Sequence, residues 1–322
     1  MSSQLAVPSF QLIPDWELET GNYKLNLMKD RIILFLIYIT AFAVGLFIGN
    51  SYTDFSLLAK SAMIVLSAVI VIWLFSFIAD NSSVFDPYWS VAPIFFTVYY
   101  LISVQGFSLI APGSWFTLVR IDLILVLVTI WGARLTWNFF RGWQGLKHED
   151  WRYVNFRKKT GFLYWVVSFL GIQLFPAFMV FMGCLSIWVS ITAGTRPMNL
   201  LDIAGILVTG MAIWLETRAD KELHQFIQQN PEKGKTIATG LWSVSRHPNY
   251  LGEISFWWGL YFFALAANPA YWWVIIGPVA MTVMFVFISI PMIEKKLMAS
   301  KNDYQEYRKK VPMLVPFKFF KK

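Results

Sequence analysis

Residues 31–50 read RIILFLIYITAFAVGLFIGN, a run of twenty residues in which Arg31 is the only charged side chain. A run of this length and composition is typical of a membrane-spanning helix, because about 20 apolar residues cross the hydrocarbon core of a bilayer. Further apolar segments of this kind lie at 57–79, 84–104, 117–140, 161–193, 198–217, 250–267 and 270–292. The sequence therefore predicts an all-α fold, a polytopic membrane helix bundle with about eight transmembrane helices.

The composition of the whole chain supports this class. Of its 322 residues, 57% are hydrophobic and only 14% are charged, which leaves too little polar surface for a water-soluble globule. We expect one membrane-embedded domain at 57–322, preceded by an extension at 1–56 with one extra helix. The single cysteine, Cys184, excludes an internal disulfide, and the three histidines lack the spacing of metal ligands, so no metal site is expected.

Basic residues are concentrated in three polar segments, 141–160, 218–249 and the tail after 294. Because cytoplasmic loops collect Lys and Arg, we expect all three segments and both termini to be cytoplasmic. The length of 161–193 fits a long tilted helix or a broken pair, and the loop charges favour a single crossing. The net charge of +8 then belongs to the membrane-facing surface and requires no nucleic-acid partner.

Polar residues stand at the start of the span at 250–267, in the stretch SRHPNYLGEISFWWG (245–259). Pro248 suits the first turn of a helix, where its missing N–H would have no partner. Arg246 and Glu253 are then seven residues apart and are expected to share one helical face. A helix N-terminus beside an arginine favours an anion, and a carboxylate accepts hydrogen bonds from ribose hydroxyls or an amide. The pattern predicts a nucleotide pocket; the alternative is an arginine that snorkels to lipid headgroups.

Other polar residues are expected at membrane depth. Glu216 and Asp220, four residues apart, form an acidic edge that could pair with Lys235 or receive ribose hydroxyls, or else a solvated helix end. Arg134 inside a span is expected to be functional or paired, because an isolated charge there is costly. Asp86 could cap a helix at the interface or donate a proton.

Four stretches carry a resemblance to a known family: WGARLTWNFFRGWQGLKHEDWRY (131–153), WLETRADKELHQF (214–226), GLWSVSRHPNYLGEISFWWG (240–259) and KKLMASKNDYQEYRKKVPMLVPF (295–317). Together they resemble the steroid 5-alpha-reductase-like superfamily of membrane proteins and, more narrowly, a bacterial branch labelled as a domain of unknown function. Arg-His-Pro followed by a Glu also occurs in the related sterol C14-reductases and isoprenylcysteine carboxyl methyltransferases. The resemblance covers about residues 57–318.

The resemblance implies that the C-terminal half binds NADPH, while an apolar substrate enters from the bilayer. With the residue patterns above, it assigns cofactor binding to Glu216, Asp220, Lys235, Arg246, His247, Asn249, Tyr250, Glu253, Tyr304, Tyr307 and Arg308. The substrate-binding residues that we expect are Trp89, Trp131 and Arg134, and the catalytic acid is Asp86 or Tyr88. Glu216 departs from the steroid enzymes, which have Asn there, and the early steroid-binding residues of those enzymes have no secure counterparts.

The predicted activity is NADPH-dependent reduction of a polarised C=C bond in a membrane-dissolved lipid or steroid-like enone, with hydride transfer to the beta carbon. The alternatives are an S-adenosylmethionine-dependent membrane methyltransferase and a non-enzymatic lipid-binding membrane protein. NADPH needs cations to bind its phosphates, whereas S-adenosylmethionine carries no phosphate. The sequence offers such cations, which favours NADPH: Lys221, Lys233, Lys235, Arg246 and Arg308. The expected location is a bacterial inner membrane.

Overall fold

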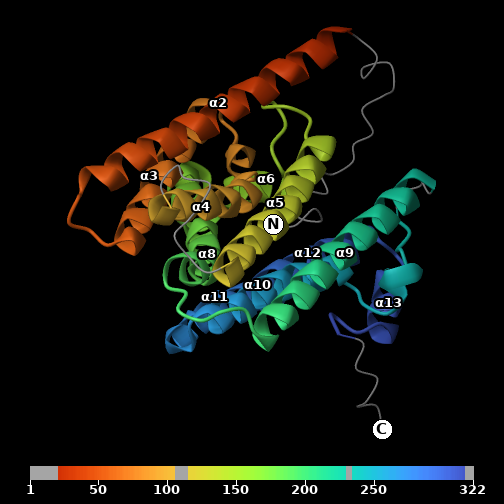
Figure 1. Cartoon of the computed structure of the whole chain (residues 1–322). Helices are drawn as coiled ribbons and strands as arrows, with labels where there is room; N and C mark the ends of the chain where they lie inside the picture. The colour runs from red at the N-terminus through yellow and green to blue at the C-terminus, as the bar shows by residue number, and fades with distance from the viewer. Residues whose placement is uncertain (1–20, 106–114, 230–233, 316–322) are drawn as a thin grey trace. The chain divides into compact units, whose positions relative to one another are not determined.

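A computed structural model describes residues 21–105, 115–229 and 234–315 (Figure 1). All regular secondary structure of these residues is helical, as the apolar runs predict. Seven of the described helical segments have the length and hydropathy to cross a membrane: Lys24–Ser51, Leu57–Ile78, Ser82–Val104, Val119–Gly142, Trp151–Thr192, Leu200–Gln229 and Pro269–Ser300. The chain is therefore an all-α, multi-pass membrane protein.

The predicted span at 250–267 forms helix α10 (Pro248–Ala267), which is not among those seven segments. Its Trp and Tyr residues and the carboxylate of Glu253 lower its mean hydropathy. Most of its side chains are buried, so that protein surrounds much of this helix. A helix enclosed in this way does not need the uniformly apolar surface that lipid contact requires.

The backbone contacts divide the chain into two compact units. Unit 1 comprises Thr97–Arg134 and Met182–Lys322, and unit 2 comprises Ala6–Phe96 and Leu135–Phe181. Helices α4 (Tyr88–Gln105), α5 (Trp115–Gly142) and α8 (Phe175–Thr192) each contribute residues to both units. These units do not test the boundary predicted from the sequence, between an extension at 1–56 and a membrane domain at 57–322. That boundary stays a prediction.

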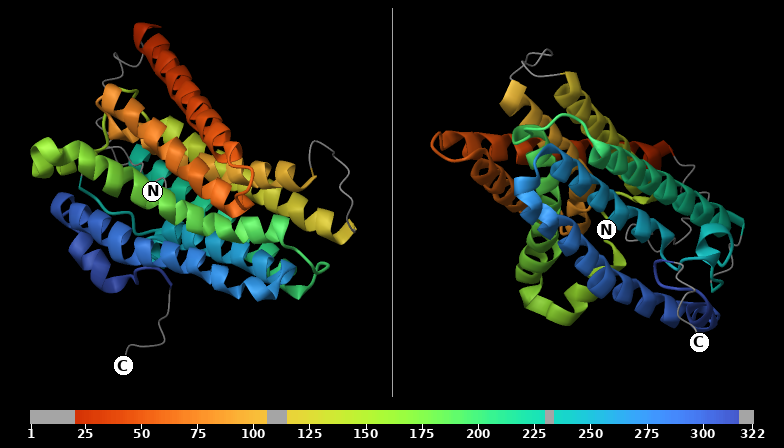
Figure 2. Two further views of the ribbon diagram at one scale, coloured as in Figure 1. Left: turned by 90° about the vertical axis from the view of Figure 1, so that its left-hand side faces the viewer. Right: turned by 60° about the horizontal axis from the view of Figure 1, so that its bottom comes forward.

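Unit 2 also contains α2 (Gly21–Ser51), α3 (Leu57–Ile78), a 3-10 helix (Ser82–Phe85), α6 (Trp151–Thr160) and α7 (Tyr164–Val167). Helix α2, which contains the predicted extra span, packs against α3 (Figure 2). The segment Trp151–Thr192 is helical except for a break at Gly161, where φ is 54°; a 3-10 turn at Gly161–Leu163 and a π-helix at Ser168–Leu174 follow. The helical run after this break agrees with the single predicted segment, while the number of crossings stays a prediction.

Unit 1 also contains α9 (Leu200–Gln229), α10, α11 (Ile276–Met284), α12 (Ile290–Ser300) and α13 (Tyr304–Lys310). Shorter pieces are the 3-10 helices Gly240–Ser243 and Pro269–Ile275 and the π-helix Phe285–Ser289. Helices α9 and α10 lie side by side and antiparallel (Figures 1 and 2). The absent side chain of Gly259 permits their close approach, because a Cβ there would lie 2.2 Å from Oγ1 of Thr209.

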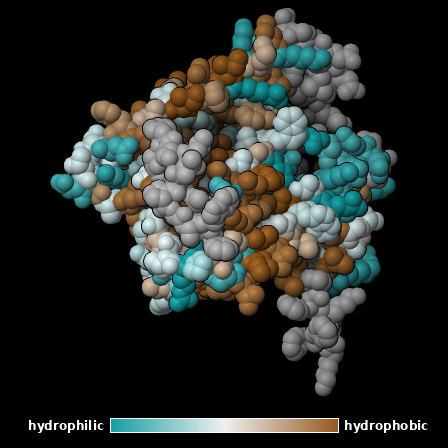
Figure 3. All heavy atoms as spheres, in the orientation of Figure 1, coloured by the Kyte–Doolittle hydropathy of each residue, from teal (hydrophilic) through white to brown (hydrophobic). Residues whose placement is uncertain are grey.

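Large apolar side chains remain exposed on several helices, as expected for surfaces that face lipid. On α2, Phe35 is 64% exposed and Phe47 is 76% exposed, and on α9 Leu207 is 66% exposed. Apolar residues also occupy much of the face shown in Figure 3. The bilayer is therefore the natural environment of these helices.

Candidate functional site

Arg134, inside the span formed by α5, binds two carboxylates of α9. Its Nη1 donates a hydrogen bond of 2.7 Å to Oδ2 of Asp220, and its Nη2 donates to Oε2 of Glu216. Glu216 is almost completely buried, Arg134 and Asp220 are 12% and 13% exposed, and all three belong to unit 1. Of the two predicted alternatives for Arg134, a functional role or pairing, the structure confirms the pairing. Its partners are Glu216 and Asp220, the acidic edge of α9.

Glu253 of α10 is completely buried and is held by two tryptophans. The Trp131 indole nitrogen donates to Oε2 over 3.2 Å, and the Trp257 indole nitrogen donates to Oε1 over 3.1 Å. Trp131 also stacks on Phe256, with ring centroids 4.3 Å apart. These contacts fix both oxygens of the carboxylate.

Glu253 also interacts electrostatically with Arg134 and Glu216. We call Arg134, Glu216, Asp220 and Glu253 the carboxylate cluster. Glu216 and Asp220 share one face of α9 because they are one turn apart. The absent side chain of Gly252 leaves room for Glu216, since a Cβ there would lie 2.4 Å from its Cγ. Three helices thus bring together four charged groups that the sequence predicted as separate site residues.

The predicted start of α10 is confirmed, with Pro248 in the first turn and His247 at the N-cap position. Arg246 consequently lies outside the helix, and its Nε donates to Glu294 over 2.8 Å. Its Nη1 donates to the carbonyl oxygens of Arg308 and Val311. We expected Arg246 to share a helical face with Glu253; instead, it ties the start of α10 to the C-terminal segment.

Glu294 of α12 is the centre of this second group. Besides Arg246, it binds Nε2 of His247 at 3.0 Å and Nε of Arg308 at 3.0 Å. Burial lowers the pKa of His247 below its ordinary value of 6.5, although Glu294 acts in the opposite direction. Arg246 and Arg308, two of the cations that we expected to bind the phosphates of NADPH, are thus already paired with Glu294.

The other predicted cofactor residues have various positions in unit 1. Asn249, Tyr250 and Tyr304 are buried, and the Tyr250 ring stacks on His247. The Tyr307 hydroxyl donates to the carbonyl oxygen of Trp242 over 2.5 Å. The side chains of Lys221 and Lys235 are exposed, and Lys233 lies outside the described residues. Their roles in cofactor binding stay predictions.

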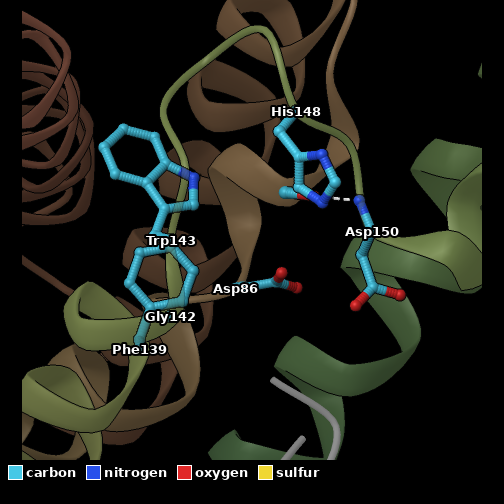
Figure 4. A pocket seen from close by; sticks show the side chains of 7 residues that line it. Asp86, Phe139, Gly142, Trp143, His148 and Asp150 are labelled. Carbon is cyan, nitrogen blue, oxygen red and sulfur yellow. Dashed lines mark hydrogen bonds between the residues drawn. The ribbon is translucent and has the colours of Figure 1, made fainter. Parts of the chain in front are cut away.

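The predicted acid Asp86 belongs to unit 2, where the Tyr153 hydroxyl donates to its Oδ1. Beside it, Nε of Arg152 lies 2.6 Å from Asp150. Tyr88 and Trp89 are buried in the same unit. Asp86 lines a pocket of about 30 Å³ together with Ser83, Phe139, Gly142, Trp143, His148 and Asp150 (Figure 4).

Two residues of these groups were not singled out in the sequence. Trp257 stands one turn after Glu253, and this spacing could have identified it as a donor. Glu294 lies near the end of an apolar span, where an acidic residue resembles a solvated helix end. The bond between Tyr153 and Asp86 could not be predicted either, because it joins residues far apart in the sequence.

Comparison with known proteins gives a family and a distant relative. The family described as "Protein of unknown function (DUF1295)" matches residues 72–311. An uncharacterized protein of Schizosaccharomyces pombe is 25% identical over 269 residues, covering 76% of this chain and 76% of the relative. No solved structure matches the chain. Since the family match extends over most of its length, the chain belongs to the DUF1295 family.

Proposed function

We propose that the protein is an NADPH-dependent reductase of a polarised C=C bond in an apolar, membrane-dissolved substrate. The observation that carries the proposal is the carboxylate cluster, in which three acidic side chains and Arg134 are gathered at membrane depth. Charged groups are costly in this environment and are usually retained for a site or a pathway. The resemblance to the steroid 5-alpha-reductase-like superfamily is part of the same proposal.

The acceptors of the cluster fit the polar parts of a dinucleotide. Carboxylates accept hydrogen bonds from ribose hydroxyls and from the nicotinamide carboxamide. Oε1 of Glu216 is buried and receives no N–H donor from the described residues, although Glu216 also contacts the carboxyl group of Glu253; a bound hydroxyl or amide could satisfy this oxygen. Glu253, fixed by two indole donors, would hold a second polar group in a defined orientation.

NADPH, when bound, supplies the hydride for the reduction. In this proposal Glu216 and Asp220 bind hydroxyl groups, and Arg134 holds both side chains in place. Asp86 or Tyr88 of unit 2 is the proposed donor of the proton, and Trp89, Trp131 and Arg134 are the proposed substrate contacts.

A methyltransferase that uses S-adenosylmethionine is the second candidate. The contacts of Arg246 and Arg308 with Glu294 favour it, because they reduce the positive charge available to phosphates. S-adenosylmethionine carries no phosphate, and its ribose hydroxyls could use the same carboxylates.

A ligand comparison on purified, detergent-solubilised protein separates the candidates. Calorimetric titration should detect NADPH binding and no comparable binding of S-adenosylmethionine. Binding of S-adenosylmethionine alone would refute the reductase and support the methyltransferase. Binding of neither, by protein that melts cooperatively, would contradict both and support the third class, a non-enzymatic lipid-binding membrane protein.

The proposed location is the inner membrane of a bacterium, with both termini in the cytoplasm. The basic segments at 141–160 and 218–249 support this orientation, because Lys and Arg collect on the cytoplasmic side.

A further inference from the structure

The pocket of unit 2 is built on a loop, 143–150, that several hydrogen bonds hold in one conformation. Asp30 accepts a bond from the backbone N–H of Leu146, and the Asn81 side chain donates to the carbonyl oxygens of Leu146 and His148. Gly145 adopts a φ of 96°, which a residue with a Cβ rarely adopts. The walls of the pocket are therefore preorganised by the surrounding unit.

Two polar atoms that line this pocket have no hydrogen-bond partner among the described residues. They are Nε1 of Trp143 and Nε2 of His148, and both atoms are buried. The Trp143 side chain is itself only 7% exposed. Figure 4 shows that the Trp143 indole nitrogen, the His148 ring and the carboxylate of Asp86 border the same space. An unsatisfied buried donor destabilises the folded protein, and a bound polar group would offset this cost.

The chemistry of the lining restricts what can bind. The indole N–H can only donate a hydrogen bond, while the carboxylate of Asp86 accepts one. The group between them should accept from Trp143 and donate to Asp86, which a hydroxyl does with a single oxygen. A second carboxylate, Asp150, lines the same pocket and disfavours an anion. The volume of about 30 Å³ exceeds the roughly 10–15 Å³ that one water-sized group needs, so a hydroxyl fits.

The position of the pocket indicates that the hydroxyl belongs to a lipid-like molecule. It lies where the candidate span Val119–Gly142 ends and where Ser82–Val104 begins. These span ends are at the level of the bilayer interface, where the polar ends of amphipathic lipids also lie. Phe139 and Trp143, stacked with centroids 5.7 Å apart, supply an apolar wall for the adjoining carbon chain.

We propose that the space between Asp86, Trp143 and His148 binds the terminal hydroxyl of an uncharged, long-chain alcohol in the membrane. Trp143 donates to the alcohol oxygen, and Asp86 accepts its proton in a hydrogen bond without chemical change. His148 supplies a third polar contact through Nε2. The site lies wholly within unit 2 and shares no residue with the proposed cofactor site of unit 1. Since Asp86 binds the alcohol here, Tyr88 is then the proton donor of the proposed reductase.

The test uses a fatty alcohol that carries a photoreactive diazirine next to its hydroxyl end. Full-length protein in nanodiscs is irradiated with this probe, and labelled peptides are identified by mass spectrometry. We expect saturable labelling within residues 139–150, which unlabelled fatty alcohol competes away. A diazirine alkane and a diazirine fatty acid of the same length should label this segment much less, because the alkane lacks the hydroxyl and the acid is repelled by the carboxylates.

Trp143→Phe removes the indole N–H and keeps an aromatic ring, so it should weaken the alcohol's apparent affinity by about two- to tenfold. The matched control is Trp137→Phe on α5, the helix that ends just before Trp143; Trp137 is 67% exposed and outside the pocket, so the affinity of this variant should equal that of the wild type. His148→Phe provides a second test if Trp143→Phe does not fold, and it should also weaken binding.

Three results would overturn the proposal. The first is equal labelling by alkane and alcohol, which would indicate unspecific partition into the interface. The second is the absence of saturable labelling, which would indicate that the pocket binds water and no alcohol. The third is unchanged alcohol affinity in a folded Trp143→Phe or His148→Phe protein. None of them bears on NADPH binding, which is measured separately.

Discussion

Arg120 and Asp202 form an ion pair in which the Arg120 Nε lies 2.6 Å from Oδ1 of Asp202 and both side chains are completely buried. The Arg120 guanidinium also donates to the carbonyl oxygens of Arg196 and Pro197. The pair therefore joins α5, the loop before α9 and the first turn of α9 within unit 1. A buried pair in which all three guanidinium nitrogens are engaged makes its two partners interdependent.

Arg120→Met should destabilise the protein by about 3–5 kcal/mol, because it leaves the carboxylate of Asp202 buried without its cation. Thermal unfolding in detergent measures the effect as a clear decrease in melting temperature. The control is Arg196→Met, whose exposed side chain should contribute less than about 0.5 kcal/mol. Equal melting temperatures for Arg120→Met and the wild type would show that the pair is not a structural link.

The contact between α9 and α10 predicts the effect of a single methyl group. Gly259→Ala should cost about 1–3 kcal/mol, because its Cβ would lie 2.2 Å from Oγ1 of Thr209 and 2.9 Å from the backbone nitrogen of that residue. Gly210→Ala on α9 is the control: a Cβ there meets nothing within 4 Å, and alanine should stabilise the helix by about 0.5–1 kcal/mol. If both variants melt alike, the helices do not pack as described.

Much of this fold could be predicted from the sequence, because long apolar runs determine where helices cross a bilayer. Helices at 57–78 and 200–229 follow such runs closely, and α9 continues beyond the predicted span at 198–217 as far as Gln229. The composition of 250–267 was equally suggestive, yet hydropathy alone does not distinguish a lipid-facing helix from one that neighbouring helices enclose.

The candidate site could be predicted only in part. The residue types and one-turn spacing of Glu216 and Asp220 identified an acidic edge, but its partner could not be assigned because Arg134 is 82 residues away from Glu216. Arg120 and Asp202 were missed since each stands near a span end, where single charges are common. Pairing across such distances depends on how helices pack, and one sequence contains no direct record of that.

The lowered pKa of His247 predicts a pH dependence of stability. In the folded protein burial keeps this histidine neutral below its ordinary pKa of 6.5, whereas the unfolded chain binds a proton there. Its contribution to stability is therefore fully present above pH 6.5 and is lost as the pH falls towards the pKa of the folded state. Melting temperatures measured between pH 8 and pH 5 should decrease more for the wild type than for His247→Gln. Parallel curves for the two proteins would contradict this assignment.

The proposed orientation of the helices depends on the basic loops and on a single crossing of 161–193, and both stay predictions. Reporter fusions after Phe156 and after Arg196 should report opposite sides of the membrane, with Phe156 on the cytoplasmic side. The fusion after Phe156 lies in the basic segment and serves as the internal reference. Reporters on the same side would show that the segment crosses an even number of times.

The central claim is that the carboxylate cluster binds NADPH, and it is tested most directly by calorimetric titration of Glu253→Gln. The substitution removes a charged acceptor that Trp131 and Trp257 hold in place, so NADPH affinity should fall by roughly tenfold. Asp54→Asn makes the same change of charge at an exposed loop residue of unit 2 and should bind NADPH as the wild type does. A Glu253→Gln protein that melts like the wild type and binds NADPH with unchanged affinity would contradict the account.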